Sequence, residues 1–580
     1  MRKFTSFLIL FGILSADTAL AQASPRENVR SIVVRASQTV LNPVLHPDQY
    51  ATLSVTGLLD NGKTMELNGS QILFTAKNKL ISGKGDVIRL DGNKVIPGEG
   101  GIATITALYQ GANQTLSATV DVVVRPYYRD YHQTLVMKLM LGMEGQPVAR
   151  LTNEPLFRKK HDVICTFEQA LELIRKTDAL TVGMPKILYL VGWQNGGHDH
   201  QYPAWDQVNP RLKRPQDATA LESLRWLIRE GRKYNTTVSL HINMADAYQH
   251  SSLWNEYVKK DIIARDVNGK LMPVEIQIQG DSMYRVSYTR EWSEGLAQKR
   301  IDALIEMIPE LKEGHTIHVD VFIARNPGMS ALSPWHAKKE NGGVDMYQEA
   351  QTQHKIFRYW RERGFDVTGE GLFWEHPPGE GFYGLQPMAW WYPTDQDYQM
   401  QTPEILSARG RTDRKGDGDF RFGSSMQGEE IFLKDRENLP DFLGQFCRTT
   451  LPWQYLSQHE RMALIGDTLF YSGGVKAARE HGHAIIRRGN FILRDNNDLF
   501  VPALWKEKTI IAYSEQGYTN RTWTLPDKWQ SVRNVDLYKI KPEGPQLLAK
   551  DQPVKESKVI LSLRPATAVM VVPAGTQLKK

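Results

Sequence analysis

The sequence has very little cysteine and no long apolar run beyond its first residues. Only Cys165 and Cys447 occur among 580 residues, which is too few, and too widely spaced, for a disulfide framework or a cysteine metal motif. We expect two buried thiols, with one long-range disulfide as the alternative. No later stretch reaches the ~18 uninterrupted apolar residues of a membrane span. The sequence therefore predicts no membrane-spanning helix after the N-terminus.

Excess charge is also small. Lysine and arginine number 71 against 65 aspartate and glutamate, a net charge of +6. There is no arginine-rich tract or basic repeat, and this argues against nucleic acid as a partner. The composition, with 41% hydrophobic and 23% charged residues, is that of a globular protein. At this length we expect more than one domain.

The first 23 residues have the pattern of a secretory signal peptide. A basic pair, Arg2 and Lys3, precedes an apolar stretch over 4–14, and the small residues Ala19 and Ala21 follow. This order is typical of a cleavable export signal. We therefore expect a bacterial protein that is secreted or periplasmic.

The rest of the chain divides into three regions with different patterns of predicted strands and helices, which predict a multidomain protein. Residues 24–126 read as short alternating strands separated by turn signals, a pattern that predicts an N-terminal Ig-like β-sandwich. Residues 127–485, after a lead-in segment, alternate strands with helix-length segments, which predicts a central (β/α)8 TIM barrel. Residues 486–580 return to strand patterns and predict a C-terminal β-sandwich.

Within the barrel region, several elements can be located from hydrophobic periodicity. Buried strands are predicted at 186–193, at 236–243 and at the segment GHTIHVDVF, and a further strand at GFDVTGEG. Helices are predicted at 220–234, 294–312 and about 344–363.

Polar residues follow four consecutive predicted strands. In a TIM barrel, catalytic residues emerge at the C-terminal ends of the strands. Asp320 is conspicuous because a carboxylate is costly to bury in an apolar strand unless it is paired or functional. The residues at these strand ends are His198, Asp199 and His200, then His241, Asn243 and Asp246, then Asp320, and finally Glu370.

Three interpretations of these residues are open. Metal binding is one, since His198, Asp199, His200 and His241 are possible ligands. A hydrogen-bonded loop stiffened by its glycines is a second. Glycoside hydrolysis by two carboxylates is the third and the favoured one, because Asp320 and Glu370 end neighbouring strands, which can supply the roughly 5 Å separation that retaining enzymes need.

Aromatic residues gather around these positions. Tryptophan can stack on sugar rings, although large barrels also bury tryptophan for packing. Of the set, Trp390 and Trp391 are the better candidates for substrate binding. The set comprises Trp193, Trp205, Phe373, Trp374, Trp390, Trp391 and Trp453.

Six segments in the same order resemble the endo-α-N-acetylgalactosaminidase family, glycoside hydrolase family 101, and its smaller relative, family 129. They are GHDHQYPAW, VSLHINMADAY, MYRVSYTREWSEGLAQKRIDALIEMIPEL, HVDVF, GFDVTGEG and LPWQYLSQH. The resemblance implies a retaining (β/α)8 enzyme that releases α-linked N-acetylgalactosamine, or the core disaccharide, from mucin-type O-glycans.

The resemblance also implies roles for single residues. Asp320 matches the nucleophile and Glu370 the general acid/base, with Glu375 as a competitor for the latter role. His198 and Asp199 match residues that hold sugar hydroxyls. His241 and Asn243 match positions that line the sugar-binding pocket of the family. The expected partner is a carbohydrate or glycoprotein, and the scheme requires no metal or organic cofactor.

Several departures from the family keep alternatives open. The loop between the two carboxylates is longer than expected, and the chain is shorter than the large multidomain mucin enzymes. Both endo action and the aglycone are therefore open. The alternatives are a retaining α-galactosidase-like exo-glycosidase, a metal-dependent barrel hydrolase and a non-catalytic carbohydrate-binding protein.

Overall fold

The computed structural model describes most of the chain between residues 28 and 578. The predicted signal peptide lies outside the described residues, as do Phe373, Trp374, Glu375, Trp390 and Trp391. No helix in the described ranges is long and apolar enough to cross a membrane. These ranges are 28–67, 69–81, 85–111, 114–143, 162–278, 281–320, 322, 333–370, 385–388, 419–424, 426–427, 432 and 438–578.

The chain forms two compact units, and the first comprises residues 1–41, 48–79 and 84–124. Buried and more exposed residues alternate along β3 and β8, so each of its two sheets has one buried face. Strand β1 of one sheet contacts β9 of the other. One sheet contains β1 (Val29–Ala36), β3 (Ala51–Leu59), β7 (Lys94–Pro97) and β6 (Ile88–Asp91), with β4 (Thr64–Leu67) beside β3, and the other contains β2 (Val40–Leu41), β9 (Thr115–Val124), β8 (Gly101–Gln110) and β5 (Ile72–Ile81).

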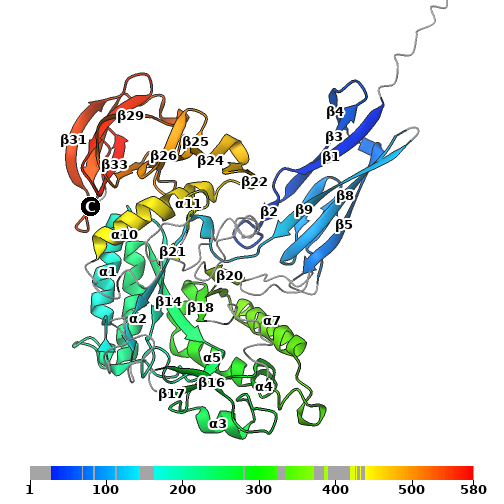
Figure 1. Cartoon of the computed structure of the whole chain (residues 1–580), viewed down its shortest axis with the longest axis vertical. Coiled ribbons are helices and arrows are strands. Elements are labelled where there is room, and N and C mark those ends of the chain that lie inside the picture. The colour runs from blue at the N-terminus through cyan, green and yellow to red at the C-terminus, as the bar shows by residue number, and fades with distance from the viewer. Residues whose placement is uncertain are drawn as a thin grey trace, which may run out of the picture. The chain divides into compact units, whose positions relative to one another are not determined.

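A parallel sheet lies at the centre of the second unit (Figure 1). All pairs of neighbouring strands in it are parallel. Strands β10, β13 and β18 are buried along their whole length, as expected for parallel strands covered on both faces. The order of the described strands is β20 (Leu385–Met388), β19 (Asp366–Glu370), β18 (Thr316–Asp320), β14 (Thr236–Asn243), β13 (Lys186–Val191), β10 (Leu135–Met140) and β21 (Met426–Gln427).

Helices connect the successive strands, and Figure 1 shows α1, α2, α5 and α7 around β14 and β18. The first, second and fourth begin with a capping box, in which a Thr or Asp side chain and a Gln or Glu three residues later satisfy free backbone N–H groups. This alternation belongs to the TIM-barrel type, while closure by an eighth strand stays a prediction. The helices are α1 (Phe167–Leu180), α2 (Ala220–Gly231), α5 (Leu296–Met307) and α7 (Met346–Glu362).

The strands predicted at 186–193, at 236–243 and at 314–322 are present as β13, which ends at Val191, as β14, and as β18, which spans Thr316–Asp320. The helix predicted over 294–312 is shorter than expected. It begins at Leu296, after Gly295 in a left-handed conformation, and ends at Met307. Pro309 explains the end, because its ring and missing N–H do not fit a helix interior. A 3-10 turn, Pro309–Glu313, follows instead.

A small insertion between β14 and α5 was not predicted. Its strands form an antiparallel three-stranded sheet in the order β15 (Asp246–Ala247), β17 (Asp281–Arg285) and β16 (Pro273–Ile278). Two short helices, α3 (Trp254–Lys259) and α4 (Tyr288–Ser293), accompany it. The insertion matters because it places Arg285 against the polar residues that follow β14.

The C-terminal part is rich in strands, as predicted, but strand structure begins at Arg461, before the expected boundary at residue 486. Helices α10 (Leu439–Gln445) and α11 (Leu451–Leu456) precede it. A core that includes stacked Phe500 and Trp523 joins its two sheets. One sheet contains β22 (Arg461–Ile465), β23 (Thr468–Tyr471), β24 (Val475–Glu480), β25 (His483–Arg488), β26 (Phe491–Asp495), β27 (Asp498–Pro502), β28 (Ile510–Ser514), β33 (Thr567–Pro573), β30 (Asn534–Lys539) and β31 (Gln546–Pro553), and the other β29 (Tyr518–Thr524) and β32 (Lys558–Leu563).

The two cysteines are not bonded to each other. Cys165 and Cys447 are both free and buried. Burial raises the pKa of the Cys447 thiol, which keeps it protonated. Two buried thiols, rather than a disulfide, are therefore what the structure contains.

Candidate active site

Strand β18 explains how Asp320 can lie in an apolar run. Side chains two residues apart on a strand share one face of the sheet. Thr316, His318 and Asp320 thus face one side, while Ile317 and Val319 face the other. All five are buried. The segment is therefore a strand with one polar face and one apolar face.

The same polar face continues onto the neighbouring strands. His241 of β14 pairs in register with His318, and Asn243 pairs with Asp320. On the other side, His318 pairs with Thr368 of β19, and its Nδ1 lies 3.0 Å from the Thr368 hydroxyl oxygen. The rings of His241 and His318 are 5.0 Å apart. The central strands thus carry a continuous polar layer just below Asp320.

A second polar layer lies nearer the N-terminal ends of the strands. The hydroxyls of Tyr189 and Thr316 are 2.5 Å apart, and the Ser239 hydroxyl donates to the Thr316 carbonyl at 2.6 Å. Tyr131 donates to Asp366 Oδ2 at 3.1 Å. Burial raises the pKa of Asp366 to about 7. This carboxyl lies at the start of β19, at the opposite end of the strand from Glu370.

Asp320 and Glu370 occupy the same register level at the C-terminal edge of the sheet. Val319 pairs with Gly369 on adjacent parallel strands, and the next residue on each strand is one of the two acids. Adjacent strands lie about 4.8 Å apart. The sequence-predicted pair is therefore brought together along the backbone, although the Glu370 side chain lies outside what the structure describes.

Two side chains of β14 contact the Asp320 carboxylate. His241 Nε2 lies 3.3 Å from Asp320 Oδ2, and the Asn243 amide donates to the same oxygen at 3.5 Å. Asp320 itself is 7% exposed. In this shielded position the carboxylate therefore accepts from the Asn243 amide and has the His241 ring beside the same oxygen.

Asn243 is fixed by the turn that follows it. Its Oδ1 accepts from the backbone N–H groups of Ala245 at 2.8 Å and Asp246 at 2.9 Å, while its Nδ2 donates to Asp246 Oδ2 at 2.8 Å. Arg285 of β17 forms a buried ion pair with Asp246. The insertion therefore neutralises Asp246 and orients the amide that contacts Asp320.

A glycine-rich loop after β13 brings His198 to the same place. A Cβ atom on Gly192 would lie 2.0 Å from the Gly142 carbonyl oxygen, and one on Gly197 would lie 2.8 Å from it. Only glycine allows this close approach at positive φ. The His198 N–H then donates to Gly142 at 3.0 Å. The glycines thus stiffen the loop, as one interpretation predicted, and the same loop places His198 among the polar residues of the site.

The predicted histidines do not all point to one site. The ring of His198 is perpendicular to that of His241 at 5.4 Å, and its Nε2 lies 3.3 Å from Asp199 Oδ2. The ring of His200 instead stacks on His250 at 5.0 Å. His198, His241 and Asp320 each offer an atom within 4.8 Å of the other two, which satisfies the spacing of a possible metal site.

Arg300 of α5 is part of the site's support and was missed by sequence reasoning. It forms a buried ion pair with Glu291, with Nε at 2.7 Å from Oε1. It also donates to the backbone carbonyls of Pro203 at 3.2 Å and Asn243 at 3.3 Å, and it lies over the Trp205 ring at 4.5 Å. An arginine within a helical run reads as solvent-exposed, so the sequence carries no signal for this role.

The three described tryptophans of the predicted aromatic set pack in the interior. Trp193 and Trp453 have no exposed surface, and Trp205 is 3% exposed. The Trp193 indole donates to the His241 carbonyl at 3.0 Å and so links β13 to β14. These three are core residues rather than open stacking platforms.

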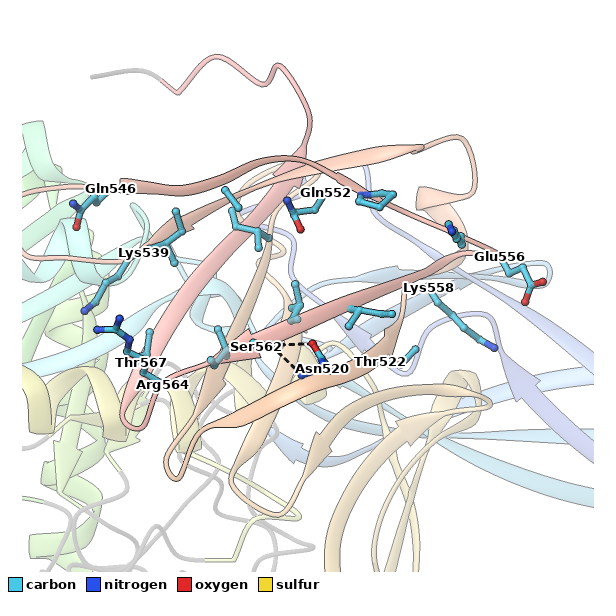
Figure 2. A pocket seen from close by; sticks show the side chains of 18 residues that line it. Asn520, Thr522, Lys539, Gln546, Gln552, Glu556, Lys558, Ser562, Arg564 and Thr567 are labelled. Carbon is cyan, nitrogen blue, oxygen red and sulfur yellow. Dashed lines mark hydrogen bonds between the residues drawn. The ribbon is translucent and has the colours of Figure 1, made fainter.

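A groove of about 970 Å³ lies on the C-terminal sheets, away from the strand ends of the barrel. Figure 2 shows polar side chains along it, and the Asn520 N–H donates to the Ser562 hydroxyl at 2.9 Å. Glu556 is the one carboxylate among its lining residues. The groove therefore lacks the pair of acids that glycoside hydrolysis requires.

Residues 160–368 match the model of a family described as endo-alpha-N-acetylgalactosaminidase. The match includes His198, His241, Asn243 and Asp320 and ends two residues before Glu370. The protein is thus a glycoside hydrolase. More narrowly, residues 160–368 are similar to the endo-α-N-acetylgalactosaminidase family, as the motif resemblance predicted. No curated protein matches the chain.

Similar solved structures include glycosidases with low sequence identity. The α-N-acetylgalactosaminidase NagBb of Bifidobacterium bifidum, in complex with GalNAc, is 10% identical at a TM-score of 0.39, over 79% of this chain and 92% of that one. An α-amylase of Geobacillus thermoleovorans is 12% identical at a TM-score of 0.36, over 76% and 98%. At these scores the structural likeness carries no argument about function.

Proposed function

We propose that this protein is a retaining glycoside hydrolase that cleaves α-linked N-acetylgalactosamine, or its core disaccharide, from mucin-type O-glycans. Asp320 attacks the anomeric carbon as the nucleophile. Glu370 donates a proton to the departing oxygen and then activates the water that releases the sugar.

The shared register level of Asp320 and Glu370 carries this proposal. Retaining glycosidases need two carboxyl groups roughly 5–5.5 Å apart, and neighbouring parallel strands are separated by about 4.8 Å. Val319 and Gly369 fix the register one residue earlier. Backbones at this spacing can bring the two carboxyl groups within the separation that retention requires, and this supports retention over inversion.

The contacts around Asp320 suggest how the nucleophile is kept ready. His241 and Asn243 are almost completely buried, at 1% and 0% exposure. In our proposal they orient Asp320, Asn243 through its amide hydrogen bond to Oδ2 and His241 through the contact of its ring with the same oxygen. Recognition of the sugar is then assigned to His198 and Asp199, which are more exposed, and to Trp390 and Trp391.

The proposal extends to the surroundings of the barrel. We take the N-terminal pair of sheets as an Ig-like sandwich and the C-terminal sheets as a second sandwich that supports the barrel. Export to the periplasm or beyond would give the enzyme access to mucin glycoproteins. A retaining α-galactosidase-like exo-glycosidase is the nearest alternative, and it would share both carboxylates.

Incubation with mucin O-glycopeptides, followed by mass analysis of the released glycan, tests the substrate and the endo or exo mode together. Aryl α-N-acetylgalactosaminide and aryl α-galactoside separate the two sugar specificities. Asp320→Asn and Glu370→Gln should each abolish turnover while the circular dichroism spectrum stays unchanged. Near-normal activity of Asp320→Asn would contradict the proposal, and activity lost in Glu375→Gln but kept in Glu370→Gln would reassign the acid.

A further inference from the structure

We infer that His198, His241 and Asp320 form a site for a borderline transition-metal ion such as Zn²⁺, and that the bound ion blocks the proposed nucleophile. The three residues come from the loop after β13, the end of β14 and the end of β18. They converge so that one possible ligand atom of each lies within 4.8 Å of those of the other two. The inhibitory part of the inference rests on the proposed function of Asp320.

The spacing of two of these residues already suits a metal. Ligands at roughly 2.0–2.1 Å from a tetrahedral Zn²⁺ ion are about 3.3 Å apart. His241 Nε2 and Asp320 Oδ2 are separated by 3.3 Å. The possible ligand atom of His198, the third residue, lies within 4.8 Å of the other two, and the His198 side chain is only partly buried.

The chemistry of the three ligands selects the metal. Two imidazoles and one carboxylate are typical of zinc sites with three protein ligands and an open fourth position. Imidazole suits Zn²⁺, Cu²⁺ and Ni²⁺, whereas Mg²⁺ and Ca²⁺ prefer oxygen ligands. A site of this composition should therefore discriminate strongly against Mg²⁺.

Asp199 supplies the outer contact that metal-binding histidines usually have. Its Oδ2 lies 3.3 Å from His198 Nε2. A carboxylate beside one ring nitrogen favours the tautomer with its proton on that nitrogen, so that in our inference the other nitrogen, Nδ1, is the ligand. Asp199 is held in a left-handed conformation at φ 51° by the same loop. The loop thus orients both the ligand and its supporting acid.

A metal at this place would compete with catalysis. Coordination uses the carboxylate lone pairs that Asp320 needs for attack on the anomeric carbon, and the ion would fill the space beside the nucleophile. Zinc should therefore lower turnover without unfolding the protein. Removing it with a chelator should restore the original rate, because no bond of the chain is changed.

The test uses the full-length protein after treatment with EDTA and gel filtration. Titration calorimetry with ZnCl₂ measures binding, and Co²⁺ serves as a spectroscopic probe because tetrahedral coordination gives intense visible absorption. His198→Gln and His241→Gln should each weaken Zn²⁺ binding at least tenfold, and Asp199→Asn should weaken it about tenfold. His483→Gln is the matched control, since His483 is an exposed histidine that pairs with Asp495 on the C-terminal sheet.

Each outcome decides the inference. The inference is supported by one saturable Zn²⁺ site whose affinity falls in the two ligand variants and stays the same in His483→Gln. Titration with MgCl₂ should show no saturable binding. Equal binding to wild type and both ligand variants, or no saturable binding, overturns it, even if the glycosidase activity is as proposed. A rate that rises with Zn²⁺ and disappears with EDTA overturns the inhibitory role and also the metal-free mechanism. Bound Zn²⁺ should raise the melting temperature of any variant that retains the site, and this shows folding independently of activity.

Discussion

Asn243 and Asp320 stand opposite each other on adjacent parallel strands, and the Asn243 amide nitrogen lies 3.5 Å from Asp320 Oδ2. The same amide is clamped by the turn at Asp246, whose charge is paired with Arg285. The nucleophile we propose is thus oriented by a residue that is itself held by a separate insertion.

Replacing Asn243 by aspartate tests this relationship with almost no change in volume. The substitution puts a second negative charge beside Asp320 and removes the N–H donor, so like charges repel in a poorly solvated site. We expect kcat/KM on an aryl α-N-acetylgalactosaminide to fall by about 10²-fold, a magnitude typical for loss of one preorganised donor. The control is Asn268→Asp, which adds the same charge at an exposed turn. Equal rates for the two variants would contradict the role of Asn243.

Arg300 offers a test of stability. Removing one partner of a buried ion pair leaves an uncompensated charge and costs about 3–5 kcal/mol. Arg300→Met should therefore lower the free energy of unfolding in urea by about that amount, because Glu291 is fully buried. The double variant Arg300→Met with Glu291→Leu should regain most of the loss.

The matched control for Arg300 is an ion pair on the surface. Arg175 and Glu172 are exposed neighbours on α1 with a 2.8 Å contact. Such pairs contribute about 0–1 kcal/mol, so Arg175→Met should hardly change the urea midpoint. A similar loss in both single variants would show that the Arg300 network contributes no more than an ordinary surface contact.

Asp366 predicts a pH dependence of stability. Burial raises the pKa of Asp366 to about 7 in the folded state, against about 3.9 in an unfolded chain. The folded state therefore binds the Asp366 proton more tightly than the unfolded chain does. This proton binding stabilises the folded state fully below pH ~4, and the stabilisation is lost as the pH rises toward 7. Asp366→Asn should flatten this decline, measured as urea midpoints between pH 4 and 7.

Asp302 provides the opposite sign as a control. The Arg363 guanidinium hydrogen-bonded to Asp302 lowers the pKa of that carboxyl. The stabilisation that the Asp302 carboxylate provides is therefore lost only as the pH falls below the ordinary pKa range of an aspartate. Asp302→Asn should leave the slope between pH 4 and 7 unchanged. An unchanged slope in Asp366→Asn would instead show that Asp366 does not hold its proton in this range.

The alternation in β18 could be predicted from the sequence, and so could the positions of Asp320 and Glu370 at strand ends. Period-2 placement depends only on neighbours in the chain. The Arg300 ion pair and the contact of Arg285 with Asp246 could not be predicted, since each joins residues whose proximity is set by the folded insertion. The shortened helix at Pro309 was readable in principle, because the restriction is local.

The glycine loop behind His198 allows a sharper test of geometry than a deletion would. Gly197 and Gly474 have the same φ of 76°, but a Cβ on Gly197 would lie 2.8 Å from the Gly142 carbonyl oxygen, whereas one on Gly474 would meet nothing within 4 Å. Alanine at either position carries the penalty of a left-handed backbone, about 1 kcal/mol. Only Gly197→Ala forces the loop to move.

We therefore expect Gly474→Ala to keep wild-type kcat/KM with a small loss of stability. Gly197→Ala should lose a similar amount of stability, plus the cost of the clash, and should reduce kcat/KM by at least tenfold, because a displacement near 1 Å in a positioned group can cost about 10²-fold. Rates on the aryl glycoside and urea midpoints measured on both variants separate the two effects. If the two alanine variants turn over substrate equally well, His198 does not need this loop conformation for catalysis, and its assignment to sugar recognition is wrong.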